Sequence, residues 1–387
     1  MENVPSSNGL EKYPKLRFPG FDGPWKLYKA EDLFKNITDK NHADETVLTI
    51  VQGRGTMPRE KAGRNIHYDD KSLSGYKRTE RGDFIIHLRS FEGGLEMANE
   101  TGIVSPAYTI LRCTKPHSSL FYNAYFHTDE FINHVLAKSV EGIRDGRQIS
   151  YEAFKWLGIP YCCPGEQAKI HGFFETLDLR IEKQRQLVDS LKKYKRGVTN
   201  AVFDKDLRFT AKGNSYPHWE QKHIGEICKI QTGKSNTQDE TAQGCYPFYV
   251  RSPIVRKSNR YLFDCEAVLT VGDGVGTGKV FHHVKGKFDL HQRVYAMTDF
   301  EMVSGKYFYH YFSHFFYDRV MRMTAKTSVD SVRYEMIDKM TIEIPCTEEQ
   351  QQIVSLLDHL EQKVADAEAT LNLLEKFKAG CLQHLFI

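Results

Sequence analysis

Residues 166–203 read EQAKIHGFFETLDLRIEKQRQLVDSLKKYKRGVTNAVF, and residues 349–386 read EQQQIVSLLDHLEQKVADAEATLNLLEKFKAGCLQHLF. The two stretches align without a gap at a constant offset of 183 positions, from their shared Glu-Gln start to their shared final Phe. Leucines recur at matched positions between these ends, for example Leu177 with Leu360. Chance similarity does not hold one register over such a length, so the chain contains an internal duplication.

The duplication extends upstream of both stretches. Tyr151 aligns with Tyr334 at the same offset, and Trp25 corresponds to Trp219 near the front of each repeat. The segment between the tryptophan and the Glu-Gln pair spans 141 positions in the first copy and 130 in the second, and the two segments show little identity. A repeat of this length indicates two related domains and not a solenoid. Each domain therefore has a repeated frame and a divergent middle.

The repeated stretches are predicted to be long amphipathic helices. Their apolar residues alternate at spacings of four and three, which is typical of a coiled-coil seam. Two ordinary core helices in separate domains are the alternative, but the shared register favours pairing of the two helices with each other. The predicted seam residues are Ile170, Phe174, Leu177, Ile181, Val188, Leu191, Ile353, Leu357, Leu360, Val364, Leu371 and Leu374.

The connection between the two helices predicts that they pair antiparallel. A helix of this length spans about 57 Å, whereas a compact domain the size of the second insert is only about 35 to 40 Å across. The second domain joins the end of the first helix to the start of the second helix, so these two ends must lie close together. We therefore expect a dumbbell with pseudo-two-fold symmetry, in which a helical rod separates two domains.

Both divergent segments read as mixed strands and loops, as in the run Gly82–Leu88, so the expected fold class is α+β. The expected organisation is a first domain over residues 1–163, a first helix over residues 164–204, a second domain over residues 205–346 and a second helix over residues 347–387.

The composition is that of a globular protein of 387 residues with a net charge of only +3. A charge this small excludes a generally polybasic DNA-coating protein, so any contact with nucleic acid must come from local clusters. No apolar run is long enough to span a bilayer and the N-terminus lacks the pattern of a signal peptide, so we expect a cytoplasmic location. The eight cysteines contain no CxxC pair and are expected to be free thiols.

No motif in the sequence would make this chain an enzyme. HExxH, a spaced Cys/His set, GxSxG, a P-loop and an NPPY-type tetrapeptide are all missing from the sequence. The glycine-rich run at residues 273–279 leads into a strand-like segment and not into a helix, and Gly233-Lys234-Ser235 lacks the upstream glycine of a P-loop. We therefore expect no catalytic, cofactor-binding or metal-binding residue.

Basic residues gather in several loops of both domains. Lys and Arg can neutralise phosphates, and Arg can also read guanine edges in a bidentate manner. A single cluster of this kind is more often a solvated surface than a binding site. The candidate DNA-binding residues are Arg54, Arg59, Lys61, Arg64, Lys77, Arg78, Lys234, Arg256, Lys257 and Lys279.

As a set, these features resemble the specificity subunits of type I restriction-modification systems. Two divergent domains are each closed by a Glu-Gln helix that contains Leu-Lys-Lys-Tyr-Lys at residues 191–195 or Leu-Leu-Glu-Lys-Phe-Lys at residues 373–378. The runs Gly102–Tyr108 and Tyr246–Arg251 support the resemblance, which covers essentially the whole chain. It implies that the two domains are target-recognition domains and that the two helices are the spacer regions between them.

The resemblance further implies a non-catalytic subunit of a larger enzyme. The expected partners are double-stranded DNA, two methyltransferase (modification) subunits, and restriction subunits that translocate and cleave DNA. S-adenosylmethionine, ATP and Mg²⁺ are then expected on these partner subunits and not on this chain. Each domain would read one half of a bipartite, asymmetric site, while the coiled coil would set the spacing and dock the modification subunits.

Two other classes of protein are compatible with parts of the sequence. A structural adaptor would use the same rod to carry two protein-binding heads that never touch DNA. A fused methyltransferase-nuclease contains a similar recognition part, but its catalytic motifs are missing from this sequence. Salt-dependent binding to DNA, with and without a modification subunit, distinguishes a DNA reader from an adaptor.

Overall fold

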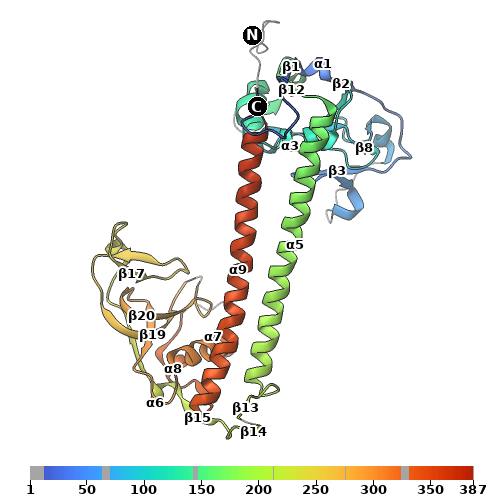
Figure 1. Ribbon diagram of the computed structural model, residues 1–387. Helices are drawn as coiled ribbons and strands as arrows, with labels where there is room; N and C mark the ends of the chain where they lie inside the picture. The colour runs from blue at the N-terminus through green and yellow to red at the C-terminus, as the bar shows by residue number, and fades with distance from the viewer. Residues whose placement is uncertain are drawn as a thin grey trace. The chain divides into compact units, whose positions relative to one another are not determined.

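The computed structural model describes residues 13–62, 70–142, 147–211, 213–274, 276–323 and 331–386. The chain forms two compact units: unit 1 comprises Met1–Arg185 and Ala369–Ile387, and unit 2 comprises Gln186–Glu368. Each unit contains a mixed α/β domain and one part of each of two long helices, α5 (Pro164–Phe203) and α9 (Thr347–Leu385) (Figure 1). These two helices confirm the long helices predicted from the repeat.

Unit 1 is built around a small four-stranded antiparallel sheet with the strand order β2-β9-β6-β7. Strands β1 and β12, β3 and β4, β5 and β8, and β10 and β11 form additional antiparallel pairs. The strands are β1 (Lys26–Lys29), β2 (Phe34–Ile37), β3 (Leu48–Val51), β4 (Gly55–Pro58), β5 (Lys77–Thr79), β6 (Phe84–Ile86), β7 (Glu96–Met97), β8 (Gly102–Val104), β9 (Thr109–Cys113), β10 (Val140–Glu141), β11 (Gln148–Ile149) and β12 (Gly158–Tyr161). The helices that precede α5 are α1 (Ala30–Leu33), η1 (Arg59–Ala62), η2 (Asp70–Gly75), α2 (Ser90–Gly93), α3 (Ser119–Phe126), η3 (Glu130–Val135), η4 (Leu136–Ser139) and α4 (Tyr151–Phe154).

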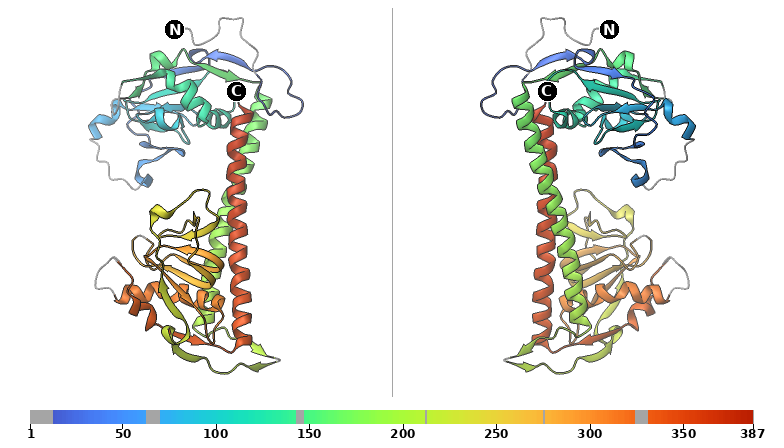
Figure 2. Two further views of the ribbon diagram at one scale, coloured as in Figure 1. Left: turned by 90° about the vertical axis from the view of Figure 1, so that its left-hand side faces the viewer. Right: turned by 90° about the vertical axis from the view of Figure 1, so that its right-hand side faces the viewer.

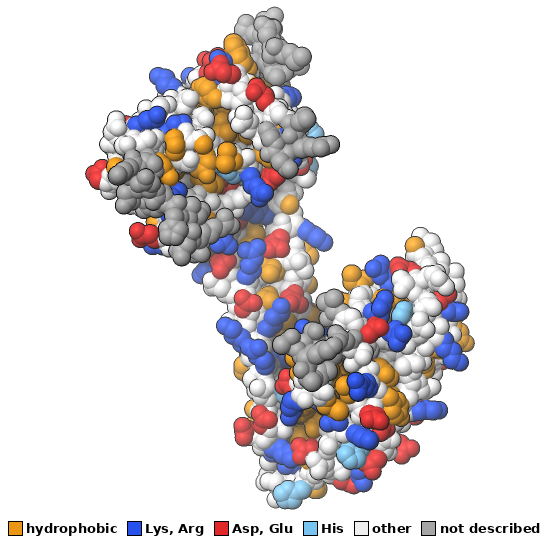
Figure 3. Space-filling view, turned by 180° about the vertical axis from the view of Figure 1, so that it is seen from behind, with side chains coloured by type: hydrophobic (Ala, Val, Ile, Leu, Met, Phe, Trp, Pro, Cys, Tyr) orange, Lys and Arg blue, Asp and Glu red, His pale blue; other side chains and the backbone are white. Residues whose placement is uncertain are grey.

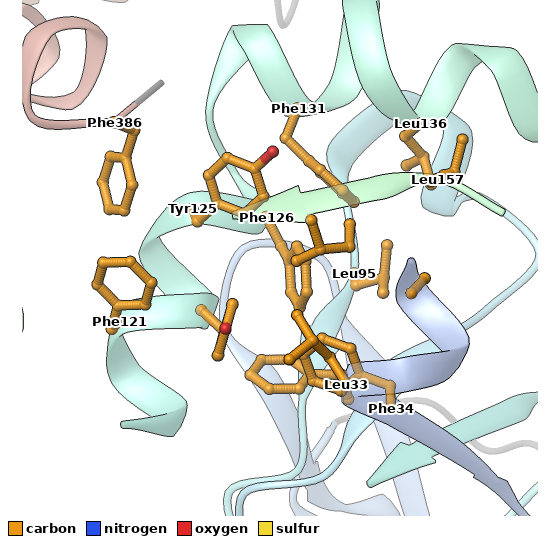
Figure 4. Packing of buried hydrophobic residues seen from close by; sticks show 14 of the residues in the cluster. Leu33, Phe34, Leu95, Phe121, Tyr125, Phe126, Phe131, Leu136, Leu157 and Phe386 are labelled. Atoms are coloured by element: carbon orange, nitrogen blue, oxygen red, sulfur yellow. The ribbon is translucent and has the colours of Figure 1, made fainter. Parts of the chain in front are cut away.

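An aromatic core lies between the sheet and α3 in unit 1. Phe84 of β6 packs edge-on against Phe126 of α3, with ring centroids 4.9 Å apart. Phe386, next to the end of α9, points towards Phe121 and Tyr125 of α3 (Figure 4), and its ring centroid lies 5.2 Å and 5.6 Å from theirs. The end of α9 is therefore part of the core of unit 1.

Unit 2 is built around a six-stranded sheet with the strand order β16-β21-β19-β20-β17-β18. Strands β15 and β22, and β13 and β14, form separate antiparallel pairs. The strands are β13 (Thr210–Ala211), β14 (Asn214–Ser215), β15 (Glu220–His223), β16 (Lys229–Thr232), β17 (Tyr246–Tyr249), β18 (Arg256–Ser258), β19 (Phe263–Val271), β20 (Phe281–Leu290), β21 (Val294–Thr298) and β22 (Thr341–Ile344). The helices that precede α9 are α6 (Ile224–Ile227), η6 (Thr237–Asp239), α7 (Gly305–Met323) and α8 (Tyr334–Asp338).

In the six-stranded sheet, β19 lies between β20 and β21 and pairs antiparallel with both. Phe288 of β20 lies opposite Phe263 at the start of β19, whereas Val294 of β21 lies opposite Val271 at its end. Residues 291–293 connect β20 to β21, so this short loop keeps the end of β20 close to the start of β21.

Helix α7 fills the core of unit 2. Its Phe312 packs against Phe281 of β20 with ring centroids 5.7 Å apart, and its Tyr311 lies 5.2 Å from Phe203 at the end of α5. Ile353 and Leu357 of α9 belong to the same buried cluster. Phe203 and Phe386 are equivalent residues of the repeat, so each long helix ends in an aromatic core built around a helix rich in aromatic residues.

Ion pairs show how α5 and α9 lie in each unit. In unit 1, Asp178 pairs with Lys378 and Arg185 pairs with Glu375. In unit 2, Lys192 pairs with Glu368 and Lys195 pairs with Glu361. In both units, the partners on α9 have lower residue numbers as the residue numbers on α5 increase. The two helices are therefore antiparallel in each unit, and they run next to each other in Figure 2. These features confirm the predicted α+β class with long antiparallel helices.

The twelve predicted seam residues are all shielded from solvent to some degree. Eight side chains are buried, and Leu191, Val364, Leu371 and Leu374 are half-buried. Apolar burial of this kind contributes about 25 cal/mol per Å² removed from water, so the stripe stabilises each helix where it packs.

The same buried ion pair occurs at the start of each long helix. Glu166, whose side chain is 1% exposed, accepts hydrogen bonds from Nε and Nη2 of Arg17 and from Nε1 of Trp25. Glu349, whose side chain is 0% exposed, accepts the same three bonds from Arg208 and Trp219. The bidentate bond to Glu166 also raises the pKa of Arg17.

The glutamine that follows each of these glutamates anchors the aromatic helix. Gln167 accepts a hydrogen bond from the backbone N–H of Ser118, the N-cap of α3, at 2.8 Å. Gln350 accepts one from the backbone N–H of Ser304 at 3.0 Å, and the Ser304 hydroxyl in turn accepts from the N–H of Tyr307 in the first turn of α7. The repeated Glu-Gln pair thus fixes both the N-terminal segment and the aromatic helix of its unit.

Candidate nucleic-acid interface

The basic candidates of unit 1 differ in the groups that their charged ends contact. Arg78 on β5 donates to Glu45 and Glu80 at 2.7 Å each, and these bonds raise its pKa. Lys77 donates to the backbone oxygen of Tyr108, and burial lowers its pKa. The guanidinium of Arg59 lies 5.9 Å from the centre of the Tyr76 ring. Arg64 lies outside the described residues.

Arg54 and Lys61 are the exposed candidates of unit 1. Arg54 stands in the turn between β3 and β4, and Lys61 lies in η1, directly after β4. Neither side chain makes an ion pair with any residue that the structure describes. These two cations are therefore available to a phosphate or a base, whereas Arg78 is already neutralised by two carboxylates.

The four basic candidates of unit 2 are all exposed. Lys234 follows β16, and Lys257 lies on the edge strand β18; neither pairs with a carboxylate among the described residues. Arg256 lies 3.2 Å from Glu240 in an exposed pair, which contributes little to stability. The ammonium group of Lys279 lies 5.2 Å from the centre of the Tyr317 ring.

A polar cluster that the sequence reasoning missed lies where the loops of unit 2 meet. Arg251, after β17, and Arg293, before β21, approach the same carboxylate, Asp273, at 3.4 and 3.8 Å. Backbone hydrogen bonds from Gly272 to Arg293 and from His291 to Tyr249 hold these loops together. Local sequence gives no signal for this cluster, because both arginines are at least 20 positions from Asp273.

The charged surface is mixed. On the face shown in Figure 3, Lys and Arg side chains are interspersed with Asp and Glu side chains over both units. This pattern agrees with the net charge of +3. Contact with DNA would therefore have to use individual loops and not a broad basic face.

His310, Asp358 and Glu361 form the group of potential metal ligands among the described residues, with ligand atoms within 4.8 Å of one another. Nε2 of His310 lies 2.7 Å from Asp358, and two ammonium groups bind the carboxylates: Lys306 lies 3.3 Å from Asp358, and Lys195 lies 2.6 Å from Glu361. Because these ammonium groups balance both negative charges, the cluster acts as an ion-pair network between α7, α9 and α5.

Acidification is expected to destabilise unit 2 before unit 1. Burial lowers the pKa values of His282, His291, His310 and His314 in unit 2. The unfolded chain then binds more protons than the native unit, so the stabilisation is present above the ordinary histidine pKa of about 6.5 and is lost as the pH falls below it. In unit 1 the two shifts oppose each other, since the pKa of His87 is lowered and that of His127 is raised.

Hydrogen exchange at pH 7.5 and pH 5.5, corrected for intrinsic exchange rates, measures this difference. Peptides of unit 2 should lose protection first, His310→Gln should reduce the loss, and the exposed His218→Gln should not. Earlier loss of protection in unit 1 would contradict the assignment.

The fold and its loops define a duplicated scaffold protein with two loop-bearing α+β domains and two long helices. Comparison with known proteins shows what this scaffold resembles: residues 217–376 match the model of the family described as Type I restriction modification DNA specificity domain. The type I restriction enzyme EcoDI specificity subunit of Escherichia coli is 26% identical over 171 residues, which cover 42% of this chain and 37% of the relative. The matched region thus spans little more than a third of that relative.

Solved structures match along nearly the whole chain. The S subunit of a type I restriction-modification system from M. genitalium matches with a TM-score of 0.61 at 14% identity and covers 97% of this chain and 99% of its own. The HsdS subunit from Thermoanaerobacter tengcongensis matches with a TM-score of 0.52 at 15% identity and covers 96% and 97%. These matches show a common fold, and together with the family match they confirm the resemblance to type I specificity subunits.

Within the described part of the chain, no helix combines the length and the apolar character needed to cross a membrane.

Proposed function

We propose that this chain is the DNA specificity subunit of a type I restriction-modification enzyme. The observation that carries the proposal is the duplication itself: two units share the buried Arg-Glu-Trp contact and the Gln-Ser contact but differ in their strands and loops. A repeated frame with divergent loops suits a protein that reads two different sequences. The chain has no catalytic role of its own.

Each unit reads one half of a bipartite, asymmetric DNA site in this proposal. The recognition domains are residues 1–163 and 205–346, and the spacer helices are residues 164–204 and 347–387. A helix of 40 residues, such as α5, is about 60 Å long, so the helices are long enough to set the gap between the two half-sites. The twelve seam residues hold the two helices together.

The partners follow from the proposed role. Two modification subunits dock on the helices and use S-adenosylmethionine, and restriction subunits use ATP and Mg²⁺ to translocate and cleave DNA. The complex acts on double-stranded DNA in the cytoplasm. Lys234, Lys257, Arg54 and Lys61 are our leading DNA-contacting residues, because their charges are exposed and unpaired within the described residues. Arg59, Lys77, Arg78, Arg256 and Lys279 already contact aromatic rings, a backbone oxygen or carboxylates.

The chain should give its modification subunits sequence selectivity. In a selection from a pool of randomised DNA duplexes, the complex should enrich a two-part sequence, and the modification subunit alone should not. Binding to the enriched duplex should weaken as salt rises, because each phosphate contact releases counterions and contributes about −0.9 to the slope of log K against log salt. A specific site is typically bound at least about a thousand-fold more tightly than random DNA.

Two results would reject the DNA-reading role. If the complex enriched no sequence while both subunits remained folded and associated, the chain would not be a specificity subunit. If the modification subunit alone enriched the same sequence, the specificity would not come from this chain. Either result would favour the adaptor alternative.

A further inference from the structure

The turn Gly53-Arg54-Gly55, which connects β3 to β4 and ends on the first residue of β4, is held by several hydrogen bonds. Both glycines have positive φ angles, 75° and 77°, a backbone conformation that other residues rarely adopt. A Cβ atom on Gly55 would lie 2.4 Å from the backbone oxygen of Met97, whereas one on Gly53 would meet open space. The turn therefore requires glycine at Gly55 for two independent reasons.

A buried carboxylate fixes the backbone of this turn. Glu96 is 0% exposed and accepts hydrogen bonds from the N–H groups of Gly53 at 2.6 Å and Gly55 at 2.8 Å. The Arg54 N–H donates to the Val51 oxygen, and Asn99 donates to the Arg54 oxygen. Three successive N–H groups and one carbonyl of the turn are thus hydrogen-bonded, so the backbone is rigid.

A histidine, His127, also contacts the carboxylate of Glu96. His127 lies 3.4 Å from Glu96, and its other ring nitrogen lies 2.7 Å from the backbone oxygen of Asn123. Burial by itself would lower the pKa of His127, but the bonds to these two acceptors raise it. Burial would likewise raise the pKa of Glu96, but bonds from His127 and Gly53 lower it. The contact between Glu96 and His127 therefore favours the charged form of each group.

The turn carries an exposed cation on this rigid base. The Arg54 side chain is exposed and forms no ion pair with the described residues. In contrast, Arg78 on β5 is bound by two carboxylates. A rigid support lowers the conformational entropy that is lost on binding, and a planar guanidinium suits bidentate recognition.

We propose that Arg54 reads a guanine in the half-site bound by unit 1, and that Glu96 is the residue that positions it. The proposal rests on the DNA-specificity role argued above and adds the residue and the base. A guanidinium donates two parallel hydrogen bonds to O6 and N7 of guanine in the major groove. A phosphate contact would need neither a rigid turn nor an arginine, since a flexible lysine would serve.

The test compares variants of the full chain in complex with its modification subunits on the enriched duplex and on duplexes changed at single base pairs of the half-site read by unit 1. Arg54→Ala should lose roughly ten- to hundred-fold discrimination at one G·C pair and leave the other positions unchanged. Arg54→Lys should restore only part of it. Gly53→Ala strains the turn without a steric clash, because Gly53 has a positive φ but open space around its Cα. It should reduce discrimination at the same G·C pair, but by less than Arg54→Ala does.

Controls separate this proposal from the DNA-specificity role. Lys138→Ala removes an exposed charge from η4 of unit 1, outside the helices that dock the modification subunits, and should leave base discrimination intact. If Arg54→Ala weakened binding to every duplex equally and reduced the salt slope by about 0.9, Arg54 would be a phosphate contact, and the base-reading proposal would be wrong. Unchanged discrimination would overturn it as well. Failure of the unmodified complex to discriminate any sequence would instead overturn the DNA-specificity role itself.

Discussion

Glu349→Ala is expected to destabilise unit 2 by roughly 2–4 kcal/mol, because it removes the buried acceptor shared by Arg208 and Trp219. The loss includes the penalty for leaving the indole N–H and part of the guanidinium without a partner. Arg208 is 26% exposed, so water can solvate some of its charge and limit the damage. Glu166→Ala should have the same effect in unit 1, where Arg17 and Trp25 lose their acceptor.

Hydrogen exchange in each unit, together with thermal unfolding, tests this expectation. Glu348→Ala is the matched control, because its side chain is exposed in the same first turn of α9 and contributes only a favourable interaction with the helix dipole of about 0.3–1 kcal/mol. Equal melting temperatures for the two variants would show that the buried contact does not stabilise unit 2.

The frame of the fold could be predicted from the sequence because its signals are periodic and repeated. The spacing of Leu177, Ile181 and Val188 indicated a long helix, and the constant offset of 183 indicated its duplication. The antiparallel direction followed from the length of the helix relative to the domain. The aligned Glu-Gln pairs marked the junction, although alignment could not show that Gln167 would bond to Ser118, because 49 positions separate them.

The candidate DNA interface was harder to predict, because exposure of a charge depends on partners that are distant in sequence. Arg78 and Arg54 looked alike in a list of basic loop residues, but Glu45, 33 positions away, neutralises Arg78. The proposed base contact of Arg54 depends on Glu96, a buried residue that accepts hydrogen bonds from the glycines on both sides of Arg54. Glu96 lies more than 40 positions after Arg54 in the sequence, so local sequence does not reveal this support. The strand order of the six-stranded sheet brings Arg251 and Arg293 to one aspartate, and strand periodicity does not specify that order.

Replacing residues 224–340 with the corresponding segment of another type I specificity subunit is expected to change one half of the recognised DNA sequence completely and leave the other half unchanged. The exchange begins after β15 and ends before β22, so it keeps the antiparallel β15–β22 pair. It also keeps the bond between Arg208 and Glu349 and both long helices. The divergent strands and loops of unit 2 are thereby removed, and of the repeated frame only the Ser304 partner of Gln350 has to be supplied by the incoming segment.

The central claim is that each unit independently reads one half-site, and genome-wide mapping of methylated bases tests it most directly. The map would be made in cells that produce the modification subunit together with either the original chain or the exchanged chain. The account predicts two bipartite methylation motifs that share the half-site of unit 1 and the gap length, and that differ in the half-site of unit 2. A change in both half-sites, or an unchanged motif from a folded and active exchanged chain, would contradict it.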